Sequence, residues 1–178
     1  VEGAARHPAF AIRFDGRELV GLSEGELLPV RRRIAMLFQS GALFDSMSVF
    51  DNLAFPLREH RAVDEEDLPR RVAELLDLVR LPGIETKLPA ARSGGMKKRV
   101  ALGRALALGP ETLLFDVPTT GLDPMTSASI ARLIRETRDR LKTTVIVVTH
   151  DLALARRVAD RIAFLDQGRF RFLGSLAE

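Results

Sequence analysis

Apolar residues recur along this chain at two spacings, and each spacing predicts a different kind of element. Over 67–79, leucines and valines fall three and four residues apart, which is typical of a helix with one buried face. Residues 113–115 and 145–148 are instead continuously apolar, and the second run is β-branched throughout. Such a run predicts a parallel strand that is covered on both faces. Strands alternate with helices along the chain, so we expect the α/β class.

Residues that commonly cap the N-terminus of a helix precede several of the segments with helical spacing. Ser23, with Glu26 three residues later, has the spacing of a capping box and predicts a short helix. Ser93 and Asp123 stand in the same position before two longer helical patterns, and a proline follows Asp123. Each predicted helix therefore begins with a polar residue that can bond its first free backbone N–H groups.

Turn residues predict two hairpins. Asp15-Gly16 lies between short apolar pieces near the start, and Asp166-Gln167-Gly168 lies between two apolar runs near the end. Residues 34–38 form a further short apolar strand that ends at Gln39. The segment 41–60 mixes apolar and small polar residues, and the pattern alone assigns no element to it.

Composition narrows the class of protein. Apolar residues make up 46% and charged residues 29% of the 178 residues, which is typical of one globular domain. No apolar run approaches the roughly 20 residues of a membrane span, and without cysteine there is no thiolate metal site. The first ten residues lack the pattern of a signal peptide, so we expect a cytoplasmic location.

The charge is slightly basic, with 27 basic and 24 acidic residues. One tight basic run, Arg31-Arg32-Arg33, is either a solvated helix face or a contact for phosphate or lipid, and the solvated face is the favoured interpretation. The chain contains neither tryptophan nor tyrosine to stack on bases. We therefore expect no nucleic-acid partner.

Three short segments carry candidate chemistry. The apolar strand at 113–115 ends in Asp116, whose carboxylate is placed to hold a Mg²⁺-bound water. Ser93-Gly94-Gly95 begins a helix and offers backbone N–H groups to a phosphate. His150 follows the strand at 144–149, at the carboxyl end where open α/β sheets bind ligands. Together these segments predict half of an ATP site.

Each of these residues, taken alone, has a simpler structural role. Ser93 and Asp123 are ordinary helix caps, and Asp116 is suited to cap a turn. His150 by itself is a loop histidine, and Gln39 alone indicates almost nothing. The functional interpretation depends on the order in which these residues occur.

In that order, the chain from about Ile12 to its C-terminus resembles the nucleotide-binding subunit of ABC transporters. The resemblance implies a P-loop NTPase fold of this family, with a parallel sheet and a helical subdomain at about 40–95, while 1–11 stay unmatched. Five elements carry it: Gln39 as the Q-loop, Ser93-Gly94-Gly95-Met96 as the signature, Leu113 to Asp116 as the Walker B strand, Gly121-Leu122-Asp123 as the D-loop, and His150 as the switch histidine.

The resemblance implies ATP and Mg²⁺ as cofactors and a role for each matched residue. Asp116 and Gln39 would hold the metal, Gln39 and His150 would act at the reacting phosphate, and Asp123 would communicate between two sites. Ser93, Gly94 and Gly95 would bind that phosphate across a head-to-tail dimer with a second ATPase subunit. The segment Gly41 to Pro56 lies where family members receive a membrane permease, so the chain would sit on the inner face of the cell membrane.

Two segments narrow the resemblance further. Residues 38–45, Phe-Gln-Ser-Gly-Ala-Leu-Phe-Asp, and residues 95–99, Gly-Met-Lys-Lys-Arg, are similar to the ATPases of lipid-trafficking importers of the Mla and MCE type. This resemblance implies transport of a phospholipid or sterol across the cell envelope.

The sequence also departs from the family. No G-x-x-x-x-G-K-[ST] loop occurs in the chain, so we expect an N-terminally truncated form with uncovered strand edges and poor solubility. Val117 stands where the family carries a catalytic glutamate, and valine has no proton acceptor. We therefore expect no ATP hydrolysis by this chain alone. The alternatives are a non-catalytic module that docks a permease or partner ATPase, or a decayed gene product.

Overall fold

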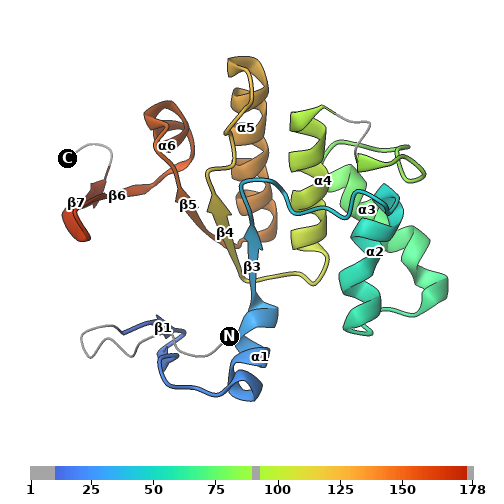
Figure 1. Cartoon of the computed structure of the whole chain (residues 1–178), viewed down its shortest axis with the longest axis horizontal. Helices are drawn as coiled ribbons and strands as arrows, with labels where there is room; N and C mark the ends of the chain where they lie inside the picture. Colours follow the sequence, from blue (N-terminus) through green and yellow to red (C-terminus); the bar gives the residue numbers. More distant parts are fainter. Residues whose placement is uncertain (1–10, 90–92, 176–178) are drawn as a thin grey trace.

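The computed structural model describes residues 11–89 and 93–175 as a central sheet flanked by helices, with a small hairpin near each end (Figure 1). Most of the segment 1–11, predicted to be unmatched, lies outside the described residues, as do residues 90–92 of the predicted helical subdomain. Within the described ranges, no helix combines the length and the hydrophobicity that a membrane span requires.

The central sheet is parallel, as the sequence predicts. Its strand order is β3-β4-β5, with bounds Ile34–Leu37, Thr112–Asp116 and Thr144–Val148. The register pairs Leu37 with Phe115 and Asp116 with Val148, so the carboxyl ends of the three strands lie side by side. Helix α5 (Pro124–Leu141) begins at the predicted cap Asp123, and helix α6 (Leu152–Val158) packs against it.

Three helices form what we call the helical region: α2 (Val49–Glu59), α3 (Leu68–Leu78) and α4 (Gly94–Leu106). A 3-10 turn, Glu65–Asp67, precedes α3. Helices α3 and α4 occur where the sequence predicts them, and α2, which begins after the cap Ser48, lies in the segment 41–60 to which the pattern assigned no element. Each pair of these helices is in contact, and their shared core includes Leu53, Leu57, Val72, Leu75, Leu76, Val79, Val100 and Leu106.

Both predicted hairpins are confirmed. Strands β1 (Arg13–Phe14) and β2 (Arg17–Glu18) pair near the start of the described chain, and β6 (Arg161–Asp166) pairs with β7 (Arg169–Ser175) near its end. Gly168 closes the second turn with a backbone φ of 73°, a conformation that glycine adopts at no steric cost.

Helix α1 (Glu24–Arg33) has the predicted capping box and runs directly into β3. The Ser23 side chain bonds the Glu26 N–H, and the Glu26 carboxylate accepts the Ser23 N–H in return. The basic run at its end is partly paired: Arg31 bonds Glu24, and Arg33 bonds both Glu111 and Asp15. These ion pairs support the interpretation of a solvated helix face.

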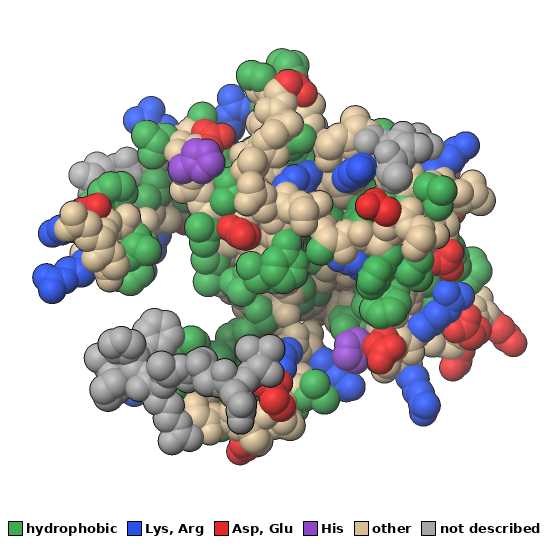
Figure 2. All heavy atoms as spheres, viewed as in Figure 1, with side chains coloured by type: hydrophobic (Ala, Val, Ile, Leu, Met, Phe, Trp, Pro, Cys, Tyr) green, Lys and Arg blue, Asp and Glu red, His purple; other side chains and the backbone are tan. Residues whose placement is uncertain are grey.

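The prediction that β5 is covered on both faces is wrong. Val145 and Val147 pack against the core, whereas Ile146 and Val148, which point the other way, are 53% and 62% exposed. Hairpin β6–β7 likewise exposes large apolar side chains, and Phe170 is 71% exposed. We call β5, β6 and β7 the C-terminal strands. Figure 2 shows hydrophobic side chains gathered at the surface over the strands. It also shows a hollow between hairpin β1–β2 and hairpin β6–β7.

Candidate functional site

Gln39 and Asp116 lie at the carboxyl ends of neighbouring parallel strands. Asp116 is the last residue of β4, and Gln39 follows the last residue of β3 by two positions. Together with Phe38, Ser40 and Thr120 they line an open depression of about 530 Å³. The sequence therefore predicts correctly that these two side chains share one edge of the sheet.

The depression offers oxygen atoms of the kinds that Mg²⁺ prefers, namely a carboxylate, a side-chain amide and two hydroxyls. Within the described residues, no group of three or more His, Cys, Asp or Glu side chains forms a closed metal cage. Magnesium usually keeps several waters and takes only one or two protein carboxylates. The donor set around Asp116 therefore fits a hydrated Mg²⁺ ion.

Val117 follows Asp116 in an unusual backbone conformation. Its φ is 41°, in the left-handed region that a β-branched residue rarely enters. Its N–H bonds the Val148 carbonyl oxygen at 2.9 Å, and its own carbonyl accepts the Thr120 N–H at 3.2 Å. These two bonds hold a strained backbone at the end of the sheet, and the side chain supplies no proton acceptor.

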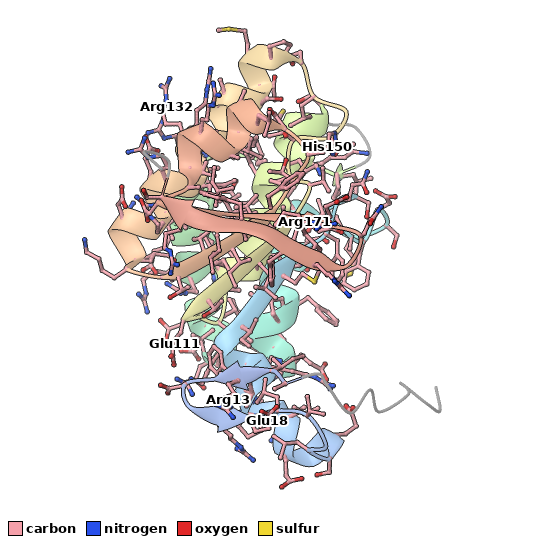
Figure 3. The ribbon with its side chains drawn as sticks, turned by 90° about the vertical axis from the view of Figure 1, so that its left-hand side faces the viewer. Arg13, Glu18, Glu111, Arg132, His150 and Arg171 are labelled. Carbon is pink, nitrogen blue, oxygen red and sulfur yellow. The ribbon has the colours of Figure 1, made fainter. Side chains whose placement is uncertain are left out.

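His150 lies at the end of the sheet where Asp116 also lies, opposite Glu111 (Figure 3). Its imidazole is exposed and lines a second hollow of about 580 Å³ together with Val117, Gly121 and Leu122. Thr120 lines both hollows, so they adjoin at this residue. His150 and Asp116 thus flank one loop, 117–122, from two sides.

Asp123 caps helix α5 in the way predicted for a structural residue. Its Oδ1 accepts the backbone N–H groups of Met125 and Thr126 at 3.0 and 2.9 Å, and its Oδ2 accepts the Thr126 hydroxyl at 2.5 Å. These bonds, the one from the Thr126 hydroxyl foremost, lower the pKa of the Asp123 carboxyl. The carboxylate is exposed and charged, and its two oxygens are committed within the first turn of α5.

Ser93, Gly94 and Gly95 lie beside the start of α5, outside the two hollows that hold Gln39, Asp116 and His150. The Ser93 hydroxyl caps α4 by accepting the Met96 N–H at 3.4 Å. A Cβ atom on Gly95 would come within 2.4 Å of the Thr126 Cγ2, and one on Gly94 within 3.0 Å of the Leu122 side chain. Both glycines therefore allow close packing against Leu122 and against Thr126 of α5.

Lys98 is a site residue that the sequence analysis missed. Its ammonium donates a hydrogen bond to the Gln39 carbonyl oxygen. Burial lowers the pKa of Lys98, and the negative charge of nearby Asp116 acts in the opposite direction. Lys98 shares a helical face with the buried residues Ala101 and Leu102, and this spacing is the signal that could have placed it inward.

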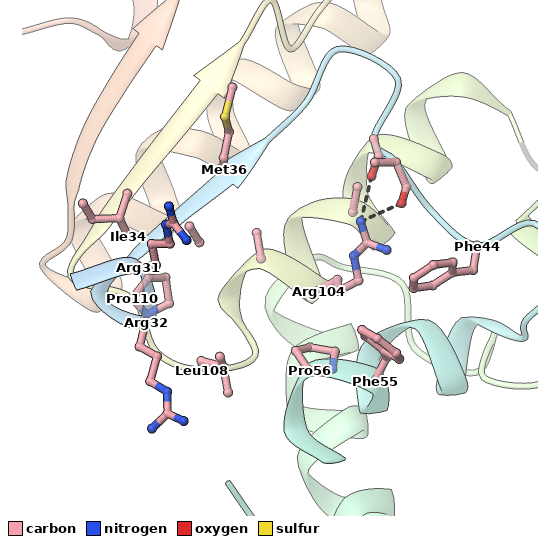
Figure 4. A pocket seen from close by; sticks show the side chains of 15 residues that line it. Arg31, Arg32, Ile34, Met36, Phe44, Phe55, Pro56, Arg104, Leu108 and Pro110 are labelled. Atoms are coloured by element: carbon pink, nitrogen blue, oxygen red, sulfur yellow. Dashed lines mark hydrogen bonds between the residues drawn. The ribbon is translucent and has the colours of Figure 1, made fainter. Parts of the chain in front are cut away.

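A groove lies on the far side of the loop that follows Gln39. It has a volume of about 350 Å³ and is lined by the end of α1, β3, α2 and α4, and its apolar residues include Ile34, Met36, Phe44, Phe55, Pro56 and Leu108 (Figure 4). Arg32 and Arg104 also line it. The segment Gly41 to Pro56, predicted to receive a permease, thus forms one wall of an apolar groove with basic side chains.

Comparison with known proteins places the chain in a family. The family described as "ABC transporter" matches residues 6–120. The methionine import ATP-binding protein MetN of Haemophilus ducreyi is 43% identical over 164 residues, covering 92% of this chain and 47% of that protein. The phospholipid transport ATP-binding protein MlaF of Haemophilus influenzae is 46% identical over 149 residues, covering 84% and 56% respectively. The chain therefore spans about half the length of the curated relatives it matches.

A solved structure gives the same answer at the level of the fold. A dimeric ATP-binding cassette in a post-hydrolysis state, bound to ADP and phosphate, superposes with a TM-score of 0.81 at 32% sequence identity. The superposition covers 93% of this chain and 73% of that one. The parallel sheet, the order of its motifs and these relatives lead to one conclusion: the chain belongs to the ABC transporter family and has the fold of its ATP-binding domain.

Proposed function

We propose that this chain is the ATP-binding part of an ABC transporter subunit that powers the transport of a phospholipid or sterol across the cell envelope. The observation that carries the proposal is the placement of Gln39 and Asp116 in one depression, with His150 at the same end of the sheet. ATP hydrolysis needs a metal-binding carboxylate and polar groups around the reacting phosphate, and this edge provides both.

Each matched residue then has a role. Asp116 and Gln39 would hold a hydrated Mg²⁺ ion, and Gln39 would also orient the attacking water. The ion, when bound, neutralises phosphate charge. His150 donates a hydrogen bond to the terminal phosphate, while Ser93 with the Gly94 and Gly95 amides presents a helix N-terminus to it.

Ser93, Gly94 and Gly95 serve a site on a second subunit in this proposal. None of the three lines either hollow of its own chain, which supports a head-to-tail dimer in which each site takes Asp116 from one subunit and Ser93 from the other. Asp123, beside this surface at the start of α5, communicates between the two sites. A related cassette being dimeric in its post-hydrolysis state agrees with this arrangement.

The membrane partner docks in the groove formed by 41–56, β3 and α4. Apolar lining favours burial of an apolar helix face, and Arg32 is free to meet an acidic rim, since no carboxylate in the described residues pairs with it. This docking would hold the chain on the inner face of the cell membrane. Lipid as the cargo rests on the similarity to MlaF, whereas the similarity to MetN favours an amino acid.

A second function, docking without hydrolysis, is favoured by Val117. A missing general base costs roughly 10²–10⁴ in rate, while binding of nucleotide does not depend on it. No G-x-x-x-x-G-K-[ST] loop is present within these 178 residues to cradle the phosphates. We therefore propose that this chain by itself does not turn over ATP.

Equilibrium binding of ATP, with and without Mg²⁺, tests the nucleotide site. We expect Mg²⁺ to strengthen binding to the unmodified chain, and Asp116→Asn to remove that effect. Asp64→Asn is the matched control, because Asp64 is exposed and its side chain makes no capping bond. Binding that is indifferent to both Mg²⁺ and Asp116→Asn would contradict the proposed metal site.

Co-purification from membranes separates the two functions and tests the cargo. A permease retained by the chain, with no ATP turnover, supports docking alone, and turnover that Asp116→Asn abolishes supports the ATPase. Lipid extraction of the purified complex then identifies cargo. Methionine binding by the complex, without phospholipid or sterol, would contradict a lipid substrate.

A further inference from the structure

Helix α4 carries two cationic side chains that end on the backbone of the loop after Gln39. Lys98 and Arg104 lie six positions apart on α4, and both reach carbonyl oxygens within residues 39–42. The loop and the helix are some sixty residues apart in sequence. The same helix begins at Ser93, so one rigid element links the predicted signature to the predicted Q-loop.

Arg104 makes the larger set of contacts. Its Nη2 donates to the Ala42 carbonyl at 2.8 Å and to the Gly41 carbonyl at 3.2 Å (Figure 4). Its guanidinium carbon lies 5.5 Å from the centroid of the Phe44 ring, within cation–π range. Burial lowers the pKa of Arg104, and no carboxylate in the described part of the chain forms an ion pair with it. The charge of this half-buried guanidinium is thus compensated by loop carbonyls and an aromatic ring.

Close packing fixes the loop between these two cations. Gly41 adopts φ 79°, and a Cβ atom there would lie 3.2 Å from the Ala101 Cβ, so the loop backbone rests directly on α4. The Gly41 N–H bonds the Phe38 carbonyl oxygen at 2.9 Å. Lys98, Ala101 and Arg104 therefore form one stripe of α4 against which residues 39–42 lie.

Helix α2 holds the continuation of the loop. The fully buried Asn52 accepts the Phe44 N–H at 2.9 Å and donates from its amide nitrogen to the carbonyls of Phe44, Met47 and Ser48 at 3.0–3.1 Å. The loop after β3 is thus bonded by side chains of two members of the helical region. At its other end, the loop is joined to β3 through Phe38.

We propose that Lys98 and Arg104 are positioning residues that fix the backbone of residues 39–42 to α4 and thereby hold the Gln39 side chain beside Asp116. The inference rests on the proposed function for the role of Gln39 at Mg²⁺. Arg104 also lines the adjacent groove, so its side chain contacts both the groove and the loop that follows Gln39.

Amide hydrogen exchange of the purified full chain, followed by NMR without nucleotide, tests the hold on the loop. Lys98→Met removes the donor at similar length, and Arg104→Lys keeps the charge but cannot reach both carbonyls. We expect the Gly41 amide to exchange at least about 10-fold faster in each variant, which corresponds to roughly 1.4 kcal/mol. The Leu53 amide, in the core of α2, should keep its rate, and Lys98→Arg should restore that of Gly41.

Matched controls make the same chemical changes elsewhere. Lys97→Met alters the neighbouring lysine of α4, and Arg32→Lys alters another arginine of the groove that makes no bond to the loop. Unchanged exchange at Gly41 in Lys98→Met and Arg104→Lys overturns the proposal. It is also overturned if Leu53 accelerates in parallel with Gly41, because the change is then global unfolding.

The Mg²⁺ dependence of ATP binding tests what the hold does for Gln39. We expect Lys98→Met to reduce the strengthening of ATP binding by Mg²⁺ about 10-fold and to leave binding without Mg²⁺ unchanged. Faster loop exchange with a normal Mg²⁺ effect overturns the positioning role. If the unmodified chain shows no Mg²⁺ effect, the proposed function fails, and the Gly41 exchange rates alone uphold or overturn the hold of α4 on the loop.

Discussion

The helical region and the C-terminal strands contain similar apolar residues, but the first region buries them and the second exposes many of them to solvent. In the helical region, Leu53 and Leu75 are completely buried, whereas Phe170 and Val148 of the C-terminal strands are 71% and 62% exposed. Burying a leucine removes about 1.5–3 kcal/mol of unfavourable hydration, and exposed side chains contribute none of it. Each apolar residue of the helical region therefore contributes more to stability than one on the exposed faces of the C-terminal strands, which present apolar surface to solvent.

The same leucine-to-alanine substitution in each region tests this difference in burial most directly, because it should lower stability far more in one of them than in the other. Leu75→Ala in α3 opens a cavity in a fully buried core, and we expect it to lower the free energy of unfolding by about 2–5 kcal/mol. Leu173→Ala in β7, where the side chain is 60% exposed, is the matched control and should cost less than about 1 kcal/mol. Urea denaturation measures both, and equal losses would refute the contrast.

Two glycine-to-alanine substitutions test how closely α4 of the helical region packs against α5. Gly95→Ala places a methyl group 2.4 Å from the Thr126 Cγ2, so α4 and α5 must separate, and we expect a loss of about 1–3 kcal/mol. Gly25→Ala in α1 meets nothing within 4 Å and should instead stabilise by about 0.5–1 kcal/mol. Thermal melting of the two variants distinguishes them, since opposite signs are expected.

Backbone strain just after β4 predicts a stabilising change outside both regions. Val117 is β-branched at φ 41°, and Val117→Asn brings a residue that enters this conformation more readily. We expect the free energy of unfolding to rise by about 1 kcal/mol. Val20→Asn serves as the control, because Val20 is an exposed valine outside the left-handed region. A gain in both variants would show that strain is not the cause.

A smaller, pH-dependent effect is expected at Asp123. Its pKa is lowered in the folded chain, so the charged carboxylate stabilises the fold above its ordinary value of 3.8. That contribution is lost as the pH falls through the lowered folded value. Asp123→Asn keeps a capping oxygen and removes the titration, so its melting temperature should fall less between pH 5 and pH 3. A parallel fall in both proteins would contradict the assignment.

The smallest change in stability, but a visible change in association, is expected from Ile146→Thr. Ile146 is 53% exposed in β5, and threonine keeps the β-branched shape, so the free energy of unfolding should change by less than about 0.5 kcal/mol. Removing apolar surface should raise the concentration at which the protein self-associates, measured by light scattering. If the concentration at which self-association begins is unchanged, the exposed side chain of Ile146 does not contribute to self-association.

Local rules predicted much of the fold. Capping residues and apolar spacing placed α1, α3, α4 and α5, and turn residues placed both hairpins. Helix α2 was missed although Ser48 and Asp51 form its cap, because Pro56 and small polar residues obscure the helical spacing of Val49, Leu53 and Leu57. The apolar run of β5 indicates a strand but does not reveal which of its faces has a neighbour.

The candidate site was predictable only where motifs mark strand ends. The order of Gln39, Asp116 and His150 placed them at one edge of the sheet, because parallel strands share a direction. The contacts of Lys98 and Arg104 with the Gln39 loop were not predictable, since they join residues about sixty positions apart and depend on how α4 packs. Val117 is recognisable as a substitution, but its strained φ is visible only in the folded backbone.

The ion pair between Arg33 and Glu111 has a consequence for the order in which the chain folds. These residues are 78 positions apart and lie where β3 and β4 begin, so the central sheet closes only after a long loop has been brought together. The contacts of α3 with α2 and with α4 span fewer residues than the pairing of β3 with β4, and shorter loops close at lower entropic cost. The helices should therefore dock first, and the depression between Gln39 and Asp116 should be among the last features to assemble.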